Sequence, residues 1–489
     1  MSKHSSGSST RKNTLYNIAY RVFSILLPLV TAPYLSRTVG QEGVGLYSYA
    51  WSVSYIFCLI GMLGLADYGV RTIAAVRDDR QQLDRTFSEI WLMQLLVAGI
   101  TLVFYLGYVF LVAGAEKTIA LSLTMMSVSC LCNLDWCLMG LDQFKPIALR
   151  NTVVKLLAAA CVFVSVHQPE DLWVYGFVWS LATLIGCLSC CLSLRGQVRF
   201  VRVPLRSALP HLKPCAVLFI SVMAVNVYRT MDKVMVGSLS SMEQNGLYEN
   251  AEKIVYCLSG FISAVGTVML PKVSHMFKQG QKEAVLRHID LSMQLVLCMV
   301  CAMAFGLAAI AKEFAPLFYG DDFTYSGMLM IPLAFTLIMI GFANVIRTQW
   351  ILPQKRDSIF VRSVTAGAVI NLVFNALLIP RMGASGAVVG TLLAEGSVPL
   401  VQFLILRKEL PYRRYLLYLT EYCGIGAIML FCVRLLSGLL PATWLGTALC
   451  ILTGGAVYGG LCLALWILTK NRRILRMIPF LGHQLAKEG

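Results

Sequence analysis

The chain has 489 residues, of which 57% are hydrophobic and only 13% are charged, and its formal net charge is +16. A soluble protein would carry about twice that fraction of charged residues, so the composition excludes the soluble class and indicates many membrane spans. The positive charge does not indicate nucleic-acid binding, because the lysines and arginines occupy short loops and form no basic domain.

The first part of the chain differs from the rest. Residues 1–13 are polar and rich in serine, and we expect them to form a disordered cytoplasmic N-terminus. From residue 14 onwards, runs of about 20 apolar residues recur, which is the signature of transmembrane helices. We therefore predict an all-α, polytopic membrane protein with about fourteen transmembrane helices. The expected helices are 14–36, 46–68, 89–113, 118–140, 149–167, 173–194, 214–237, 247–269, 290–313, 326–350, 358–380, 387–406, 417–438 and 444–469.

The connecting loops differ in charge between the two sides of the predicted membrane protein. Nearly all loop lysines and arginines fall on one side, and the other side has only Arg37, Lys117 and Arg381. The positive-inside rule then places both termini in the cytoplasm. Two longer loops on the basic side, 76–87 and 277–289, mix charges with spaced apolar residues, and we expect a short amphipathic helix in each.

A short motif occurs twice. Gly45-Leu46-Tyr47 begins the second helix, and Gly246-Leu247-Tyr248 begins the eighth, about two hundred residues later. The repeat indicates two copies of one six-helix module. The predicted domains are an N-lobe at 14–205, a C-lobe at 206–410, and two additional helices with a cytoplasmic tail at 411–489.

Ionisable side chains inside the predicted spans are costly to bury, and they usually face a cavity or a partner. The seventh helix is the strongest case, since Asn226, Arg229 and Lys233 share one face. Asp232 lies close enough in sequence to pair with Arg229. The surplus of positive charge predicts that this face binds an anionic ligand. The alternative is that Asp232 and a carboxylate from another helix, such as Glu252, complete the pairing internally.

Other charged residues lie in the spans as well. The remaining candidates for the same cavity are Arg21, Lys155, Lys253 and Arg347. For basic residues near helix ends, snorkelling to lipid headgroups is the alternative, and it is our expectation for Arg434. Asp135 and Glu249 are further ionisable residues within spans.

The sixteen cysteines lie mostly inside apolar runs, including the C-x-x-C pairs Cys187/Cys190 and Cys298/Cys301. We interpret them as small hydrophobic residues. No cluster has metal-ligand spacing, and we recognise neither a phosphate-binding loop nor an enzyme site. We therefore expect no enzyme activity, no metal and no cofactor.

Several motifs together resemble one known family. They are residues 65–71 (LADYGVR), 135–136 (DW), 140–144 (GLDQF), 150–151 (RN) with Lys155, and 231–237 (MDKVMVG). The set is similar to that of bacterial polysaccharide flippases of the multidrug/oligosaccharidyl-lipid/polysaccharide exporter superfamily. Where many members have an aromatic pair and a glutamine after the tryptophan, this chain has Cys137-Leu138-Met139.

The resemblance implies a MATE-like fold of two six-helix lobes, related by a pseudo-twofold axis around a central cavity. It also implies alternating access and a substrate in which undecaprenyl pyrophosphate carries a short oligosaccharide, moved across a bacterial cell membrane. The implied partners are that lipid-linked diphosphate, membrane lipids, a polysaccharide polymerase and other assembly proteins. The sequence leaves the sugar, the oligomeric state and the coupling ion, H⁺ or Na⁺, open.

Three other functions remain. A multidrug or other small-molecule exporter would have the same architecture, with an acidic coupling site in the first lobe. A polytopic glycosyltransferase or polymerase usually needs a sizeable outer loop, and the outer loops here are short. A non-transporting scaffold would have no need of charges buried within its spans.

Overall fold

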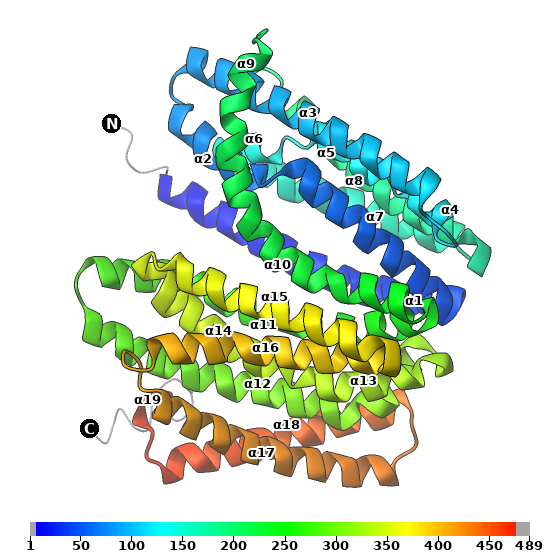
Figure 1. Ribbon diagram of the computed structural model, residues 1–489. Helices are drawn as coiled ribbons and strands as arrows, with labels where there is room; N and C mark the ends of the chain where they lie inside the picture. The colour runs from blue at the N-terminus through cyan, green and yellow to red at the C-terminus, as the bar shows by residue number, and fades with distance from the viewer. Residues whose placement is uncertain (1–5, 476–489) are drawn as a thin grey trace. The chain divides into compact units, whose positions relative to one another are not determined.

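The computed structural model describes residues 6–475, and all their side chains except those of 6–26, 220–222, 224–225, 227–229 and 472–473. Within this range the chain forms helices and no β-strand, as the apolar runs predict (Figure 1). α1 begins at Ser6, so residues 6–13, which we expected to be disordered, are helical. Extending an existing helix adds a hydrogen bond for each residue it orders, so a polar stretch next to an apolar run can join the helix.

The chain divides into two compact units, the first ending at Glu249 and the second beginning at Asn250. We predicted a lobe boundary between residues 205 and 206 from the internal repeat. The division into compact units does not test that boundary. The first unit contains α1 (Ser6–Met62), α2 (Leu65–Val76), α3 (Arg80–Leu111), α4 (Lys117–Ser122), α5 (Thr124–Cys132), α6 (Asp135–Gly140), α7 (Phe144–Ser165), α8 (Leu172–Leu194), α9 (Leu205–Ala208), α10 (Leu212–Leu239) and the first residues of α11 (Met242–Lys278).

The second unit contains the rest of α11 and the later helices. These are α12 (Lys282–Tyr319), α13 (Thr324–Ala334), α14 (Thr336–Ile346), α15 (Asp357–Met382), α16 (Ala384–Leu406), α17 (Tyr412–Leu439), α18 (Trp444–Leu468) and α19 (Arg472–Leu475). In this unit α15 packs against α16, and α12 packs against α13, α17 and α18 (Figure 1). The two additional helices, α17 and α18, are therefore attached to the unit through α12.

Twelve helical segments of the described residues are long and apolar enough to cross a membrane. The count differs from fourteen in two places. The segment Leu27–Val76 includes the second half of the predicted helix 14–36 and all of 46–68, and α1 has non-helical backbone angles at Gly40, with φ 70° and ψ −173°. The predicted helix 214–237 corresponds to α10, part of which lies outside the described side chains.

The expectation of a short amphipathic helix in each of the two basic loops was wrong. α2 ends at Val76 and α3 begins at Arg80, so the loop between them is short. The Asp79 side chain caps α3 by accepting hydrogen bonds from the backbone N–H groups of Gln81 at 2.9 Å and Gln82 at 3.1 Å. The second such segment is likewise divided between the end of α11 and the start of α12. The spaced apolar residues belong to the helices on either side of each loop.

The repeated glycines lie at a close helix crossing within the first unit. A Cβ atom on Gly45 would lie 1.7 Å from the carbonyl oxygen of Met242, and one on Gly246 would lie 2.0 Å from that of Gln41. Each glycine therefore contacts the residue four positions before the other. This reciprocal pattern is the one that two copies of a motif make around a twofold axis. The repeat has a physical cause, because only glycine allows the two backbones to approach this closely.

Candidate functional site

A polar cluster near this crossing joins α1, α10 and the start of α11. The Lys233 ammonium lies 2.6 Å from Oε2 of Glu249, and the Ser48 hydroxyl donates a hydrogen bond to the same oxygen at 3.0 Å. The side chains of Lys233 and Glu249 are 15% and 14% exposed. Ser48 and Glu249 are 201 residues apart and occupy equivalent positions of the repeated motif. A desolvated cation is thus matched by a carboxylate from the second copy of the repeat.

Two other described polar side chains on α10 also have partners in the first unit. Asp232 is 2% exposed and accepts a hydrogen bond from the hydroxyl of Tyr248 at 2.8 Å. Asn226 accepts one from the hydroxyl of Tyr55 on α1 at 3.1 Å. The helical spacing predicted that Asn226, Arg229 and Lys233 share one face of this helix. Asn226 contacts α1 and Lys233 contacts α11, whereas the side chain of Arg229 is not described.

The remaining predicted site residues are spread over both units. Lys155 is half-buried on α7 of the first unit, and Lys253 is half-buried on α11 in the second. Arg347 begins a π-helical turn, Arg347–Ile351, and its guanidinium lies 5.1 Å from the ring centre of Phe360. The side chains of Arg21 and Arg229 lie outside the described residues. That these cations line one cavity stays a prediction.

A second polar cluster arises because the fourth predicted helix is broken. The expected continuous helix 118–140 is instead α4, α5 and α6, with Asn133 and Leu134 between the last two. Gln94 on α3 supports the break, since its side-chain amide donates to the carbonyl oxygens of Cys130 at 2.6 Å and Asn133 at 2.9 Å. Its own oxygen accepts a hydrogen bond from the Trp136 indole at 2.9 Å. A broken span requires such partners, because lipid offers the freed backbone groups none.

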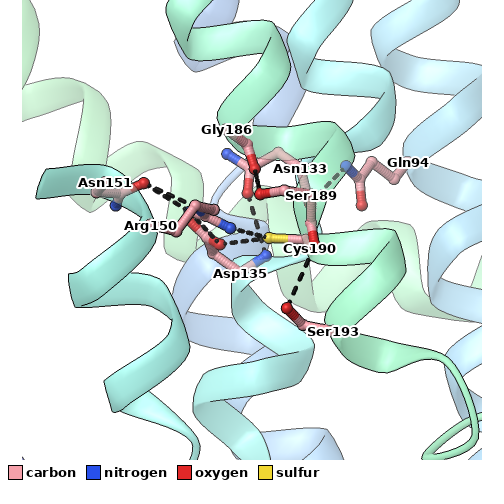
Figure 2. Close-up of polar contacts among 9 residues, drawn as sticks. All are labelled: Gln94, Asn133, Asp135, Arg150, Asn151, Gly186, Ser189, Cys190 and Ser193. Atoms are coloured by element: carbon pink, nitrogen blue, oxygen red, sulfur yellow. Dashed lines mark hydrogen bonds and ion pairs between the residues drawn. The ribbon is translucent and has the colours of Figure 1, made fainter. Parts of the chain in front are cut away.

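The break positions Asp135 in the first turn of α6, where it meets Arg150 of α7. Nη2 of Arg150 lies 3.0 and 3.1 Å from the two carboxylate oxygens, and the side chains are 11% (Arg150) and 23% (Asp135) exposed. The thiol of Cys190 on α8 donates to Asp135 at 2.8 Å and also contacts Nη1 of Arg150. Figure 2 shows the three side chains pointing toward one another, with Asn151 accepting from Arg150. The cluster ties three helices together and contains its own counter-charge.

Sequence reasoning found part of these two clusters. Asp135 and Glu249 were noted as charges within spans, but neither was placed in the site. The sequence presents Arg150 only as part of a family motif. Cys190 was interpreted as a small hydrophobic residue, and it lies in polar contact with both members of the ion pair. Gln94 was missed, and its only signal is that it is an amide within an apolar run.

Arg434, which lies outside both polar clusters, also has an ion-pair partner. We expected Arg434 on α17 to snorkel to lipid headgroups. Its Nη1 lies 3.0 and 3.1 Å from the carboxylate oxygens of Glu313 on α12, and its Nη2 donates to the carbonyl of Ala308 at 3.1 Å. The guanidinium is therefore held by α12, and it attaches the first additional helix to the second unit.

Comparison with known proteins gives the family. A family model described as "Polysaccharide biosynthesis protein" matches residues 10–277, and one described as "Lipid II flippase MurJ" matches residues 173–454. A protein of Escherichia coli (strain K12) named "Putative O-antigen transporter" is 22% identical over 407 residues, which are 82% of this chain and 97% of that protein.

Solved structures give the fold. The structure described as "Lipid II flippase MurJ, inward closed conformation" matches with a TM-score of 0.77 at 16% identity, over 93% of this chain and 98% of that chain. An inward-facing multidrug resistance transporter of the MATE family matches with a TM-score of 0.58 at 14% identity, over 81% and 94% of the two chains. The MATE-like, all-α fold expected from the sequence is thus confirmed, and so is the resemblance to the flippase family. The chain belongs to the polysaccharide biosynthesis protein family, whose model matches more than half of it.

Proposed function

We propose that this protein is a flippase that moves an oligosaccharide linked to undecaprenyl pyrophosphate from the cytoplasmic to the outer leaflet of a bacterial cell membrane, during polysaccharide biosynthesis. The observation that carries the proposal is the family match over residues 10–277, together with the resemblance to an Escherichia coli protein over 97% of that protein's length. The protein would transport its substrate by alternating access, without making or breaking a covalent bond.

The charges in the spans support a substrate with a diphosphate group. Phosphate oxygens form strong charge-assisted hydrogen bonds with lysine and arginine. We propose that Lys233 contacts the diphosphate together with the other predicted cations, which are Arg21, Lys155, Arg229, Lys253 and Arg347. Glu249 would neutralise Lys233 in the empty protein, because an unpaired buried cation is costly. The arriving diphosphate would replace that carboxylate as the partner of Lys233.

Orientation and partners follow from the same proposal. The basic loops favour cytoplasmic termini. The product would appear in the outer leaflet, where a polysaccharide polymerase and other assembly proteins would use it. A gradient of H⁺ or Na⁺ would drive the return of the empty protein, with no bound cofactor.

Deletion of the gene in its own host tests the function. We expect lipid-linked oligosaccharide to accumulate inside the cell and surface polysaccharide to disappear, with both restored by the wild-type gene. Unchanged polysaccharide combined with greater sensitivity to organic cations would contradict the proposal and favour a multidrug exporter.

Substitution of Lys233 tests the proposed contact. Lys233→Gln should reduce restoration by about tenfold or more, since one charge-assisted contact is worth roughly 1.5–3 kcal/mol. Lys233→Arg should retain partial activity because it keeps the charge. Lys278→Gln, at an exposed lysine at the end of α11, is the matched control and should be fully active. Equal activity of Lys233→Gln and the control, at equal membrane levels, would remove Lys233 from the transport site.

A further inference from the structure

The second unit contains a polar cavity that lies where α12, α17 and α18 come together. Its volume is about 540 Å³, within the range of pockets that bind small molecules, roughly 300–1,000 Å³. The cavity lies near the beginning of α12 and of α17 and at the end of α18. Its lining includes Asp290, Arg414, Leu417, Tyr418, Glu421 and Lys470.

The lining carries two anionic and two cationic side chains. Nε of Arg414 lies 3.3 Å from Asp290, and the Tyr418 hydroxyl donates to the same carboxylate oxygen at 3.3 Å. Asp290 is 9% exposed, whereas Arg414 is 57% exposed, so the guanidinium keeps donors for a further partner. Glu421 supplies the second negative charge, and Lys470 supplies the second positive charge.

The walls of the cavity continue into an apolar surface. Leu417 lines the cavity and is 61% exposed, and Leu468, the last residue of α18, is 81% exposed and directly precedes the lining residues that follow this helix. Exposed leucines on a membrane-spanning helix contact acyl chains. Helix ends that carry arginine and lysine lie at the level of the lipid headgroups. The cavity thus combines a balanced set of charges with an adjoining surface for hydrocarbon.

We propose that this cavity binds the headgroup of a phospholipid that carries both a phosphate and a primary ammonium, as phosphatidylethanolamine does. The phosphate contacts Arg414 and Lys470, and the ammonium contacts Glu421 and Asp290. The acyl chains lie along Leu417. The bound lipid bridges α12 to both additional helices, so it stabilises their attachment.

The charge balance selects among lipids. A headgroup with only a negative charge is attracted by two lining cations and repelled by two carboxylates. A choline headgroup has no N–H group, so it forms no hydrogen bond with the carboxylates. A headgroup with a phosphate and a primary ammonium satisfies both signs. Its phosphate pairs with the lining cations, and its ammonium donates up to three hydrogen bonds to the carboxylates.

Binding can be measured on the full-length protein, purified in detergent and stripped of lipid. Phosphatidylethanolamine, phosphatidylcholine, phosphatidylglycerol and soluble phosphoethanolamine are added separately. Thermal unfolding and native mass spectrometry report stabilisation and retained lipid. We expect phosphatidylethanolamine to raise the unfolding temperature most and to be retained at about tenfold lower concentration than the other lipids.

Three variants locate the effect. Glu421→Gln should abolish the preference for ethanolamine over choline while phospholipid still binds. Arg414→Gln should weaken retention of every phospholipid by about tenfold. The matched control is Arg413→Gln, an exposed neighbour outside the cavity lining, which should behave as wild type. Arg414→Gln also removes a partner of Asp290, so this variant could fail to fold. In that case Glu421→Gln, which leaves the Arg414–Asp290 pair intact, still tests the proposal.

Other results would overturn the proposal. Equal stabilisation by the choline and ethanolamine lipids would exclude recognition of the ammonium. An effect of soluble phosphoethanolamine as large as that of the lipid would identify a free zwitterion as the ligand. An unchanged lipid preference in Glu421→Gln would place the lipid elsewhere on the protein.

Discussion

At the scale of single residues, the pair Asp135–Arg150 offers the clearest energetic test. Removing one partner of a buried ion pair leaves the other charge uncompensated, at a cost of about 3 kcal/mol. Arg150→Gln should therefore lower the unfolding temperature of the purified protein markedly. The double variant Asp135→Asn with Arg150→Gln should recover part of the loss, because neither charge then remains. Additive losses in a double-mutant cycle would show that the two side chains do not interact.

A second residue-scale prediction concerns pH and lies outside the membrane spans. Glu409 accepts hydrogen bonds from Arg356 at 2.6 Å and from the Trp350 indole at 2.9 Å. These contacts, that of Arg356 foremost, lower the pKa of Glu409 below its usual value of 4.5. A lowered pKa contributes stability above pH 4.5, and this contribution is lost as the pH falls through the pKa of the folded protein.

Arg356→Gln removes the main cause of that shift. The variant should be less stable than wild type at pH 7 by at most about 1 kcal/mol, since the pair is partly exposed. The difference should shrink as the pH falls below 4.5. Thermal unfolding of both proteins across this range measures it. A difference that stays constant with pH would show that the stabilisation does not depend on the charge of Glu409.

The sequence predicted some site residues and could not predict others, for a physical reason. The shared face of Asn226 and Lys233 follows from helix geometry, so it can be predicted from the sequence alone. Their partners on α1 and α11 are set by tertiary packing. Helix spacing therefore cannot identify Glu249 as the carboxylate that lies 2.6 Å from Lys233.

At the scale of helices, the crossing at Gly45 and Gly246 gives a matched pair of experiments. Gly45→Ala and Gly246→Ala should each destabilise the protein by about 3 kcal/mol or more, because the added methyl group would overlap a backbone carbonyl that cannot rotate away. The control is Gly107→Ala in α3, where no atom lies within 4 Å of the new methyl group. It should be neutral or stabilising by up to about 1 kcal/mol. Equal effects at Gly45 and Gly107 would contradict the close crossing.

Helix existence was predicted better than helix continuity. The apolar runs identified nearly every span. The break between α5 and α6 has only a weak local signal, because neither proline nor glycine occurs there and the one turn-forming residue is Asn133, whose side chain accepts a hydrogen bond from the backbone N–H of Asp135 at 3.2 Å. The backbone groups freed there are satisfied by Gln94, which comes from another helix. Such a break depends on a contact distant in sequence, so hydrophobic periodicity cannot reveal it.

At the scale of the whole molecule, the loop charges predict the orientation in the membrane. Cysteines introduced at Ser240, between α10 and α11, and at Gln279, between α11 and α12, should differ in accessibility. A membrane-impermeant thiol reagent added to intact cells should label Ser240→Cys and leave Gln279→Cys unlabelled. Native Cys161 and Cys191, which are exposed, are first replaced by alanine. Labelling of Gln279→Cys alone would reverse the orientation and the direction of transport with it.

The central claim is that the protein moves a lipid-linked oligosaccharide across the bilayer. Its most direct test uses proteoliposomes that contain the purified protein and a labelled undecaprenyl-diphosphate oligosaccharide in the inner leaflet. A sugar-cleaving enzyme added outside measures how much substrate reaches the outer leaflet. With wild-type protein, the cleaved fraction should rise with time well above that of protein-free liposomes, and Lys233→Gln should slow the rise by about tenfold. A wild-type time course equal to that of protein-free liposomes, under imposed H⁺ and Na⁺ gradients, would contradict the claim.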